Sequence, residues 1–335
     1  MDNTEDKVQR IQSVIDTYDV KRKTFINDEP LSMYINKNVE HIYVINLERD
    51  QIRRNYVTVL MKKYKINFEF IIVNPISEYQ YNAINNKSIT IGETGCYLSH
   101  MYCLNDAIKN NYNNIIIFED DIIFHKKFHE RFKNIGDLGK FDILMLGAAD
   151  FSFYKIHRNA CIHNTIYKPH TNLLGAHAIL YSRRGVEEMY RTRITNPTYF
   201  DFNLEGFLDI FEHSFFICFP NLVVAELSTT NLGHNFGVTN QIKESLYYRK
   251  CFSNALDFND YNFIYLLIFS NNTHNFFKIK KSFQANIKQI VEYSHFKIIA
   301  SSTLEKENVK ATMLKRMSYD FFTTNDLEFI LFNKL

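Results

Sequence analysis

Up to about residue 240 the chain alternates short apolar runs with segments of helical periodicity, and this alternation constrains the fold most. Residues 41–47, 68–73 and 115–118 are short runs rich in β-branched and aromatic residues, which is typical of buried strands. Between them, residues 51–64 and 95–110 carry the pattern of helices. The alternation predicts an α/β fold with a mixed, mainly parallel sheet. Further strands are expected at 141–146, at 176–181 and within 215–225.

The two ends of the chain differ from this pattern. Residues 5–28 place apolar side chains at helical spacing, so the sequence predicts an amphipathic N-terminal helix. From about residue 240 the chain is aromatic, and a helical region is expected. We therefore predict an N-terminal helical extension over 1–38, a nucleotide-binding domain over 39–239 and a C-terminal helical region over 240–335.

Charge and composition exclude several classes of protein. The 39 basic residues are balanced by 37 acidic ones, so the net charge of +2 gives no basis for nucleic-acid binding. The N-terminus is polar and acidic, unlike a signal peptide, and the longest apolar run, 263–269, is too short to span a bilayer. The five cysteines are an odd number without the close pairs of a zinc site, which favours a reducing compartment. We expect a cytoplasmic protein with no membrane span.

Three adjacent carboxylates, Glu119, Asp120 and Asp121, directly follow the expected strand 115–118. In open α/β sheets, ligands bind beyond the carboxyl ends of the strands. Adjacent carboxylates repel one another, and a hard divalent ion bound to a diphosphate would offset that repulsion. The alternative is a solvated acidic turn that caps a helix at 126–133.

Basic residues and glycines follow two other expected elements. Asn46 and Arg49 end the strand 41–47, and Arg53 and Arg54 lie in the next helix, where they could hold phosphate or form an ordinary basic surface. Gly92 and Gly95 precede or open the helix 95–110, and Cys96, Ser99 and His100 follow on it. Glycines there allow close approach of a ligand to the backbone, and small residues equally suit close packing on a sheet.

Together these segments resemble glycosyltransferase family 25. The matching motifs are Ile45-Asn46-Leu47-Glu48-Arg49 with Arg53-Arg54; Gly92, Gly95, Cys96, Ser99 and His100 in the pattern G-x-x-G-C-x-x-S-H; Glu119-Asp120-Asp121; the strand and turn from Gly175 to Gly185; and Asp201 ahead of Pro220-Asn221-Leu222-Val223. The resemblance covers about residues 40–235. One departure is that the family's P-x-D around the late aspartate reads Pro197-Thr198-Tyr199-Phe200-Asp201 here.

The resemblance implies a GT-A fold and an inverting transfer of galactose or glucose from a UDP-sugar to a hydroxyl of a glycan or glycoprotein. It implies Mn²⁺, or Mg²⁺, on the donor diphosphate, held by Asp121, Glu119 and His234. The residues implied for the nucleotide sugar are Asn46, Arg49, Arg54, Gly92, Gly95, Ser99 and Asp120. Asp201 is the implied base for the acceptor hydroxyl, with Glu205 as the second choice.

Two other classes of function stay open. One is a catalytically inactive GT-A-fold protein that binds carbohydrate or has a structural role. The other is a metal-dependent phosphoesterase, because acidic clusters also serve metal-assisted hydrolysis. The terminal regions could support a homodimer. The abundance of Phe, Tyr, Asn, Ile and Lys without Trp is typical of an AT-rich genome, such as those of some giant viruses, in which case a virion or viral factory replaces the cytoplasm as the expected location.

Overall fold

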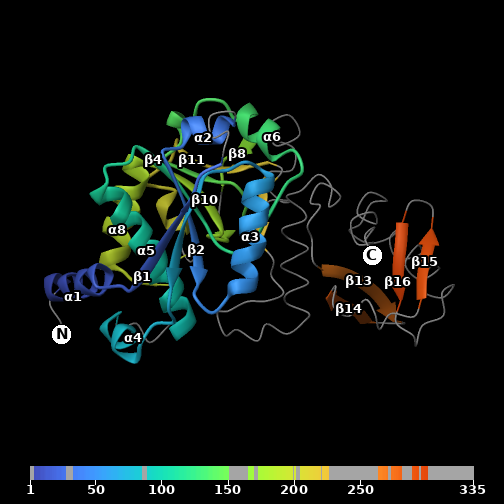
Figure 1. Cartoon of the computed structure of the whole chain (residues 1–335), viewed down its shortest axis with the longest axis horizontal. Helices are drawn as coiled ribbons and strands as arrows, with labels where there is room; N and C mark the ends of the chain where they lie inside the picture. The colour runs from blue at the N-terminus through green and yellow to red at the C-terminus, as the bar shows by residue number, and fades with distance from the viewer. Residues whose placement is uncertain are drawn as a thin grey trace. The chain divides into compact units, whose positions relative to one another are not determined.

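The computed structural model describes residues 4–27, 33–84, 89–150, 165–169, 173–198, 200, 204–219 and 221–225, and the backbone of four later strands (Figure 1). The chain forms two compact units. The first comprises Met1–Ile122, Lys127–Ala225 and Thr230–His234, and the second comprises Ile123–Lys126, Glu226–Thr229 and Asn235–Leu335. Within the described residues, no helix combines the length and the apolar character that a bilayer crossing requires.

An eight-stranded sheet forms the centre of the first unit. Its order is β1-β3-β2-β4-β10-β6-β11-β8. The strands are β1 (Val20–Phe25), β2 (His41–Leu47), β3 (Phe68–Val73), β4 (Asn114–Phe118), β6 (Ile143–Met145), β8 (Ile166–Tyr167), β10 (Ala178–Ser182) and β11 (Phe215–Cys218). Every residue of β3 is buried, and so is each of the last four residues of β4, as expected for a sheet covered on both faces.

The predicted mixed sheet is confirmed, but the expectation that it is mainly parallel is wrong. The pairs β3–β2, β2–β4 and β6–β11 are parallel. The pairs β1–β3, β4–β10, β10–β6 and β11–β8 are antiparallel. The reason is that β10 enters between β4 and β6 against the direction of both, and β1 and β8 join the two edges as antiparallel strands. A buried strand has the same apolar composition in either direction, so the sequence pattern could not reveal this.

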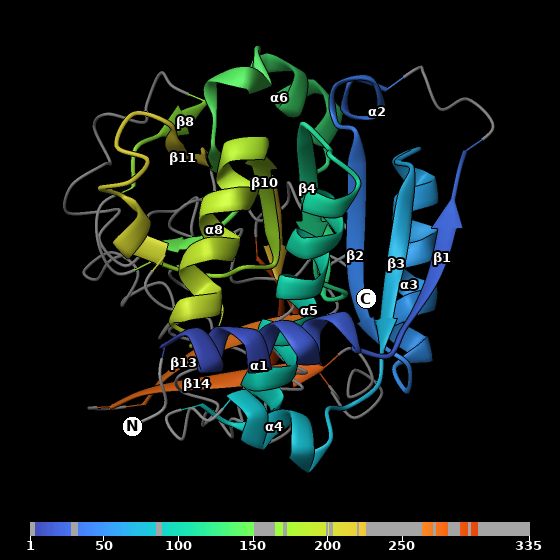
Figure 2. The same ribbon diagram turned by 90° about the vertical axis from the view of Figure 1, so that its left-hand side faces the viewer.

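Helices cover both faces of the sheet. Figure 2 shows α5 (Ile91–Lys109) and α8 (Arg183–Thr195) in front of it and α3 (Gln51–Lys63) behind. The helix α1 (Thr4–Asp16) contacts α4 (Glu78–Ile84), α5 and α8, while α2 (Tyr34–Asn38) contacts α6 (Phe128–Asn134). A capping box starts α5: the Thr90 hydroxyl accepts from the Glu93 amide, and the Glu93 carboxylate accepts from the Thr90 amide.

The N-terminal helix is shorter than predicted. It ends at Asp16, and Val20–Phe25 form the edge strand β1 instead of continuing the helix to residue 28. Val20 pairs with Val73 and Phe25 with Phe68 of β3. Pairing with a fully buried neighbour satisfies the backbone of this segment, so tertiary context overrides the helical spacing of its side chains.

The prediction of a helical C-terminal region is wrong where the structure describes that region. Its described segments are strands: β13 (Phe263–Ser270) pairs antiparallel with β14 (Thr273–Lys280), and β15 (Gln289–Tyr293) with β16 (Phe296–Ala300). These segments are rich in Ile, Phe, Tyr and Val, whose side chains favour strands over helices. The expected boundary at 239/240 stays a prediction.

Candidate active site

A pocket of about 410 Å³ opens where the parallel strands β2, β3 and β4 end. Its walls come from the end of β2, the segment after β3, the start of α5 and the triplet 119–121. Of the predicted nucleotide and metal residues, those that line this pocket are Asn46, Arg49, Gly92, Gly95, Ser99, Glu119, Asp120 and Asp121. The topology therefore brings together residues that are far apart in the sequence at the sheet edge where α/β proteins bind ligands.

Asp120 is held at the pocket wall by two donors. Its Oδ2 accepts a hydrogen bond from Asn46 Nδ2 at 2.6 Å, and its Oδ1 accepts one from Arg53 Nη1 at 2.8 Å. Burial raises the pKa of the Asp120 carboxyl, and the opposing effects of Arg53 and Asn46 do not cancel that increase. The carboxylate is therefore fixed in orientation by its neighbours before any ligand arrives.

Arg54 positions Asn46 from behind and does not line the pocket. Its Nε donates to Asn46 Oδ1 at 2.6 Å, and its Nη2 donates to the Glu48 carbonyl oxygen at 2.6 Å. These bonds leave the Asn46 amide nitrogen directed at Asp120. Arg54 thus contacts Asn46, which lines the pocket, and its role in nucleotide binding stays a prediction.

Two arginines line the pocket. Arg53 contacts Asp120 and also lies 3.8 Å from Asp121 Oδ2 through its Nη1. Burial alone would lower the pKa of the Arg53 guanidinium, but the carboxylates of Asp121 and Asp120 outweigh this effect and raise it. Arg49 is exposed and, within the described part of the chain, makes neither a hydrogen bond nor an ion pair. Arg49 is therefore a cation available to an anionic ligand.

Glu119 faces helix α5. Its Oε1 lies 3.1 Å from Nε2 of the buried His100 and 3.7 Å from Cys96 Sγ. Burial would raise the pKa of Glu119, but the hydrogen bond and charge of His100 outweigh it, so the pKa is lowered. The ligand atoms of Cys96, His100 and Glu119 lie within 4.8 Å of one another and could hold a metal. The His100 ring also stacks on Phe200, with 4.1 Å between ring centroids.

Asp121 completes the acidic wall. Its side chain is 17% exposed and lines the pocket. The three carboxylates thus have different surroundings: His100 beside Glu119, Asn46 and Arg53 at Asp120, and the more distant Arg53 at Asp121. Oxygen atoms of this kind suit Mn²⁺ or Mg²⁺, and the pocket gives access to Glu119 and Asp121.

The start of α5 forms the opposite wall. A Cβ added at Gly95 would meet only Ile76 Cγ2 at 3.7 Å, so packing does not require glycine at this position. Ser99 Oγ donates to the Gly95 carbonyl at 2.7 Å and lies 3.3 Å from the Tyr18 hydroxyl. Tyr18 itself lines the pocket.

Three predicted residues cannot be placed. Asp201 and His234 lie outside the described residues, and of Glu205, in the 3₁₀ turn Leu204–Phe207, only the backbone is described. Arg53 and Tyr18 line the pocket, although neither was among the residues implied for the nucleotide sugar or the metal. Arg53 carried a signal, because it is half of an arginine pair that could hold phosphate. Tyr18 carried none, because the strand that follows it was not predicted.

Comparison with known proteins supports the family. The model of glycosyltransferase family 25 (LPS biosynthesis protein) matches residues 39–192. A glycosyltransferase 25 family member of Aedes aegypti is 29% identical over 128 residues, which are 32% of this chain and 21% of that protein. A Haemophilus influenzae protein named "Putative glycosyltransferase" is 40% identical over 92 residues, which are 25% of this chain and 33% of that protein.

The aligned part of this chain therefore spans a third or less of these relatives. The matched region nevertheless contains β2, α3, β3, α5 and β4. Every residue that lines the pocket, except Tyr18, falls within it. Residues 39–192 of this chain are therefore similar to glycosyltransferase family 25.

Proposed function

We propose that this protein transfers galactose or glucose from a UDP-sugar to a hydroxyl group of a glycan or glycoprotein, with inversion at the anomeric carbon. The observation that carries the proposal is one pocket in which Asn46, Arg53 and Asp120 are pre-positioned and which Arg49 also lines, without an ion-pair partner among the described residues. A nucleotide sugar needs both kinds of group: cations for its diphosphate, and hydrogen-bond acceptors for its hydroxyls.

In this proposal Asp121 and Glu119 would hold Mn²⁺ or Mg²⁺, and His234 would be a further ligand. Their accessible carboxylate oxygens fit a hard divalent ion. A bound ion would neutralise the charge that develops on the leaving diphosphate. Because Glu119 also accepts from His100, Asp121 is the first choice of ligand.

The other side chains bind and orient the donor. Arg49 would contact the diphosphate, and Asp120 would accept from hydroxyls of the ribose or of the transferred sugar. Asn46 holds Asp120 in place, and Arg54 holds Asn46. Gly92, Gly95 and Ser99 have no side chain or a short one where they line the pocket at the start of α5.

The acceptor hydroxyl requires a base if the reaction inverts the anomeric carbon. Asp201 is the proposed base, and Glu205 is the alternative.

The test is release of UDP from UDP-galactose and UDP-glucose by the full chain without acceptor, with Mn²⁺, with Mg²⁺ and with a chelator. A transferase should bind UDP and hydrolyse one of the two donors slowly, only with metal. A phosphoesterase would instead cleave p-nitrophenyl phosphate, and an inactive homologue would bind at most. The test variant is Asp121→Asn, in the pocket. Its matched control is Asp137→Asn, at the residue that caps the turn Leu138–Lys140. Loss of activity in both would contradict a specific role for Asp121.

A further inference from the structure

The N-terminal segment lies outside the family-matched residues 39–192, but it reaches the candidate site through Tyr18. This side chain is only 7% exposed and forms part of the pocket lining. Its hydroxyl lies 3.3 Å from Ser99 Oγ, and its ring is tilted against Tyr102, with 6.4 Å between centroids. A residue from outside the matched region thus shares a wall with a residue inside it.

The position of Tyr18 is fixed by the strand that follows it. Val20 pairs with Val73, the last residue of β3, so Tyr18 lies beside the segment that leaves β3 at Asn74 and Pro75. Asn74 Nδ2 also donates to Asp19 Oδ2 at 3.2 Å. The register of β1 therefore determines which residue of the N-terminal segment reaches the pocket.

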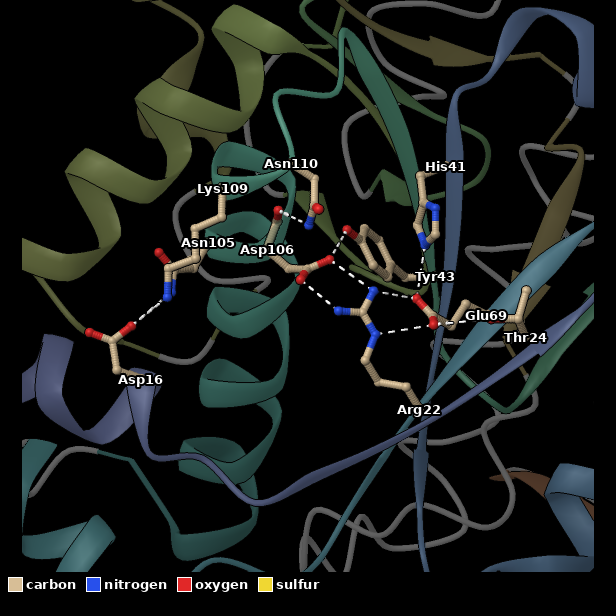
Figure 3. Close-up of polar contacts among 10 residues, drawn as sticks. All are labelled: Asp16, Arg22, Thr24, His41, Tyr43, Glu69, Asn105, Asp106, Lys109 and Asn110. Carbon is tan, nitrogen blue, oxygen red and sulfur yellow. Dashed lines mark hydrogen bonds and ion pairs between the residues drawn. The ribbon is translucent and has the colours of Figure 1, made fainter.

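A charged clamp holds that register. Figure 3 shows the Arg22 guanidinium between two carboxylates, Glu69 of β3 and Asp106 of α5. Its Nη2 lies 2.6 Å from Glu69 Oε2, and its Nη1 lies 2.7 Å from Asp106 Oδ1. Tyr43 also donates to Asp106, at 2.6 Å. Because one guanidinium binds both a strand and a helix of the domain, β1 cannot shift along β3 without breaking both ion pairs.

The surroundings of Tyr18 suit the nucleoside part of a ligand better than its phosphates. The neighbouring lining comes from Val73, Asn74, Pro75 and Ile76, together with Ser99, and includes no charged side chain. Apolar surface with a few hydroxyl and amide groups is the usual lining for a planar, uncharged ring system. Burial raises the pKa of Tyr18 to about 12, and the hydrogen bond with Ser99 lowers it only in part, so the hydroxyl stays protonated at neutral pH and can form a hydrogen bond with an uncharged ligand.

We propose that Tyr18 is a specificity-determining residue for the nucleoside of the bound nucleotide, supplied by a segment that precedes the family-matched region. The hydroxyl of Tyr18, with that of Ser99, would hydrogen-bond the nucleoside, and the ring would limit the space beside Pro75 to a pyrimidine. The inference rests on the proposed function, because it assumes that the pocket binds a nucleotide.

The experiment is calorimetric titration of the full chain with UDP, CDP, ADP and GDP at one fixed metal concentration. The variants are Tyr18→Phe, which removes only the hydroxyl, and Tyr18→Ala, which opens the wall. Tyr18→Phe should weaken UDP binding by about 3- to 10-fold, the effect of one lost hydrogen bond. Tyr18→Ala should reduce the preference for UDP over ADP by about 10-fold or more, because the wall that excludes the larger base is gone.

Tyr190→Phe is the matched control. The Tyr190 hydroxyl donates to Gln12 Oε1 of α1 at 2.6 Å, so this variant also removes a tyrosine hydroxyl that anchors the N-terminal segment, but away from the pocket lining. It should leave all four affinities unchanged. Wild-type affinity and selectivity in both Tyr18 variants would overturn the inference, and so would an equal loss in Tyr190→Phe. A wild-type chain that binds none of the four nucleotides would overturn the proposed function as well.

Discussion

Adjacent residues of the triplet 119–121 have different partners, and this decides what each can do. Asp120 is held by Asn46 and Arg53, and Glu119 lies beside His100. Repulsion among the three charges is therefore partly offset by protein groups. We therefore expect a substitution at Asp121 to affect catalysis more than stability.

We expect Asp121→Ala to reduce transfer by about 100-fold or more, because a lost metal ligand removes several kcal/mol of charge stabilisation. The fold should survive, since the substitution also removes a like charge from beside Asp120. Turnover and melting temperature are measured on the same preparation. Retained turnover, or a chain that no longer folds, would show that Asp121 is not a metal ligand.

Arg49→Ala should weaken UDP binding by about 1–3 kcal/mol, as expected for a lost charge-assisted hydrogen bond. Its melting temperature should not change, because Arg49 makes no hydrogen bond or ion pair with the rest of the described chain. Calorimetry with UDP measures the first effect and thermal unfolding the second. Arg191→Ala, an exposed arginine on α8, is the control. Unchanged UDP affinity in Arg49→Ala would identify Arg49 as an ordinary surface cation.

At this scale the sequence indicated which segments meet, but not which way each side chain faces. The pair Arg53-Arg54 is the clearest case. Successive residues of a helix point about 100° apart, so only one of two adjacent arginines can line a given wall. The rotation of α3 about its axis is set by packing on the sheet, and it directs Arg53 to Asp120 and Arg54 to Asn46.

At the scale of elements, the backbone approaches two glycines so closely that no side chain fits there. A Cβ at Gly185, in the first turn of α8, would lie 2.0 Å from the Asp142 carbonyl oxygen, just before β6. A Cβ at Gly147 would lie 1.8 Å from the Val223 carbonyl oxygen. Both obstacles are backbone atoms, so a side chain at either position forces the elements apart.

Gly185→Ala should therefore lower the free energy of unfolding by about 1–3 kcal/mol, the usual cost of overpacking. Gly95→Ala is the matched comparison, because both glycines lie in helices but Gly95 has room for a methyl group. It should leave stability unchanged or raise it by up to about 1 kcal/mol. Denaturant titration of both variants measures the difference. Equal stability of the two would contradict the close packing of α8 on Asp142.

The strands whose bounds the sequence predicted correctly are those that are covered on both faces of the sheet. β2 and β3 have the predicted bounds, because each is a continuous apolar run that is covered on both sides. β1 was missed because its middle residues are charged and exposed, which resembles the polar face of a helix. The strands β13 to β16 were missed because aromatic residues occur in both helices and strands, and periodicity alone does not separate short apolar runs.

At the scale of the whole molecule, the clamp around Arg22 makes stability depend on pH. Burial opposes the charge of Glu69, but hydrogen bonds from His41 and Arg22 outweigh it and lower its pKa to about 2. A carboxyl whose pKa is lower in the folded chain stabilises it above the unfolded pKa, and that contribution is lost as the pH falls. The window here runs from about pH 5 down to about pH 2.

Glu69→Gln should lower the free energy of unfolding by about 1–3 kcal/mol at pH 7 and by about half as much at pH 3, because the wild-type advantage fades on protonation. Urea titrations of both chains between pH 7 and pH 3 measure this difference. Glu130→Gln, whose side chain is 61% exposed, is the control and should show no such trend. A constant difference between wild type and Glu69→Gln would mean that the Glu69 charge does not contribute.

The edge position of β1 has a practical consequence. A chain shortened to the family-matched residues would begin after β1 and would leave β3 as the edge of the sheet. The sequence of β3, Phe-Glu-Phe-Ile-Ile-Val, would then present unpaired backbone groups on a strand with five apolar residues out of six. Such an edge readily recruits a strand from another copy, whereas β1 ends the sheet with Lys21, Arg22 and Lys23. We therefore expect the N-terminal strand to protect this chain from aggregation, and a fragment cut at the limits of the family match to aggregate.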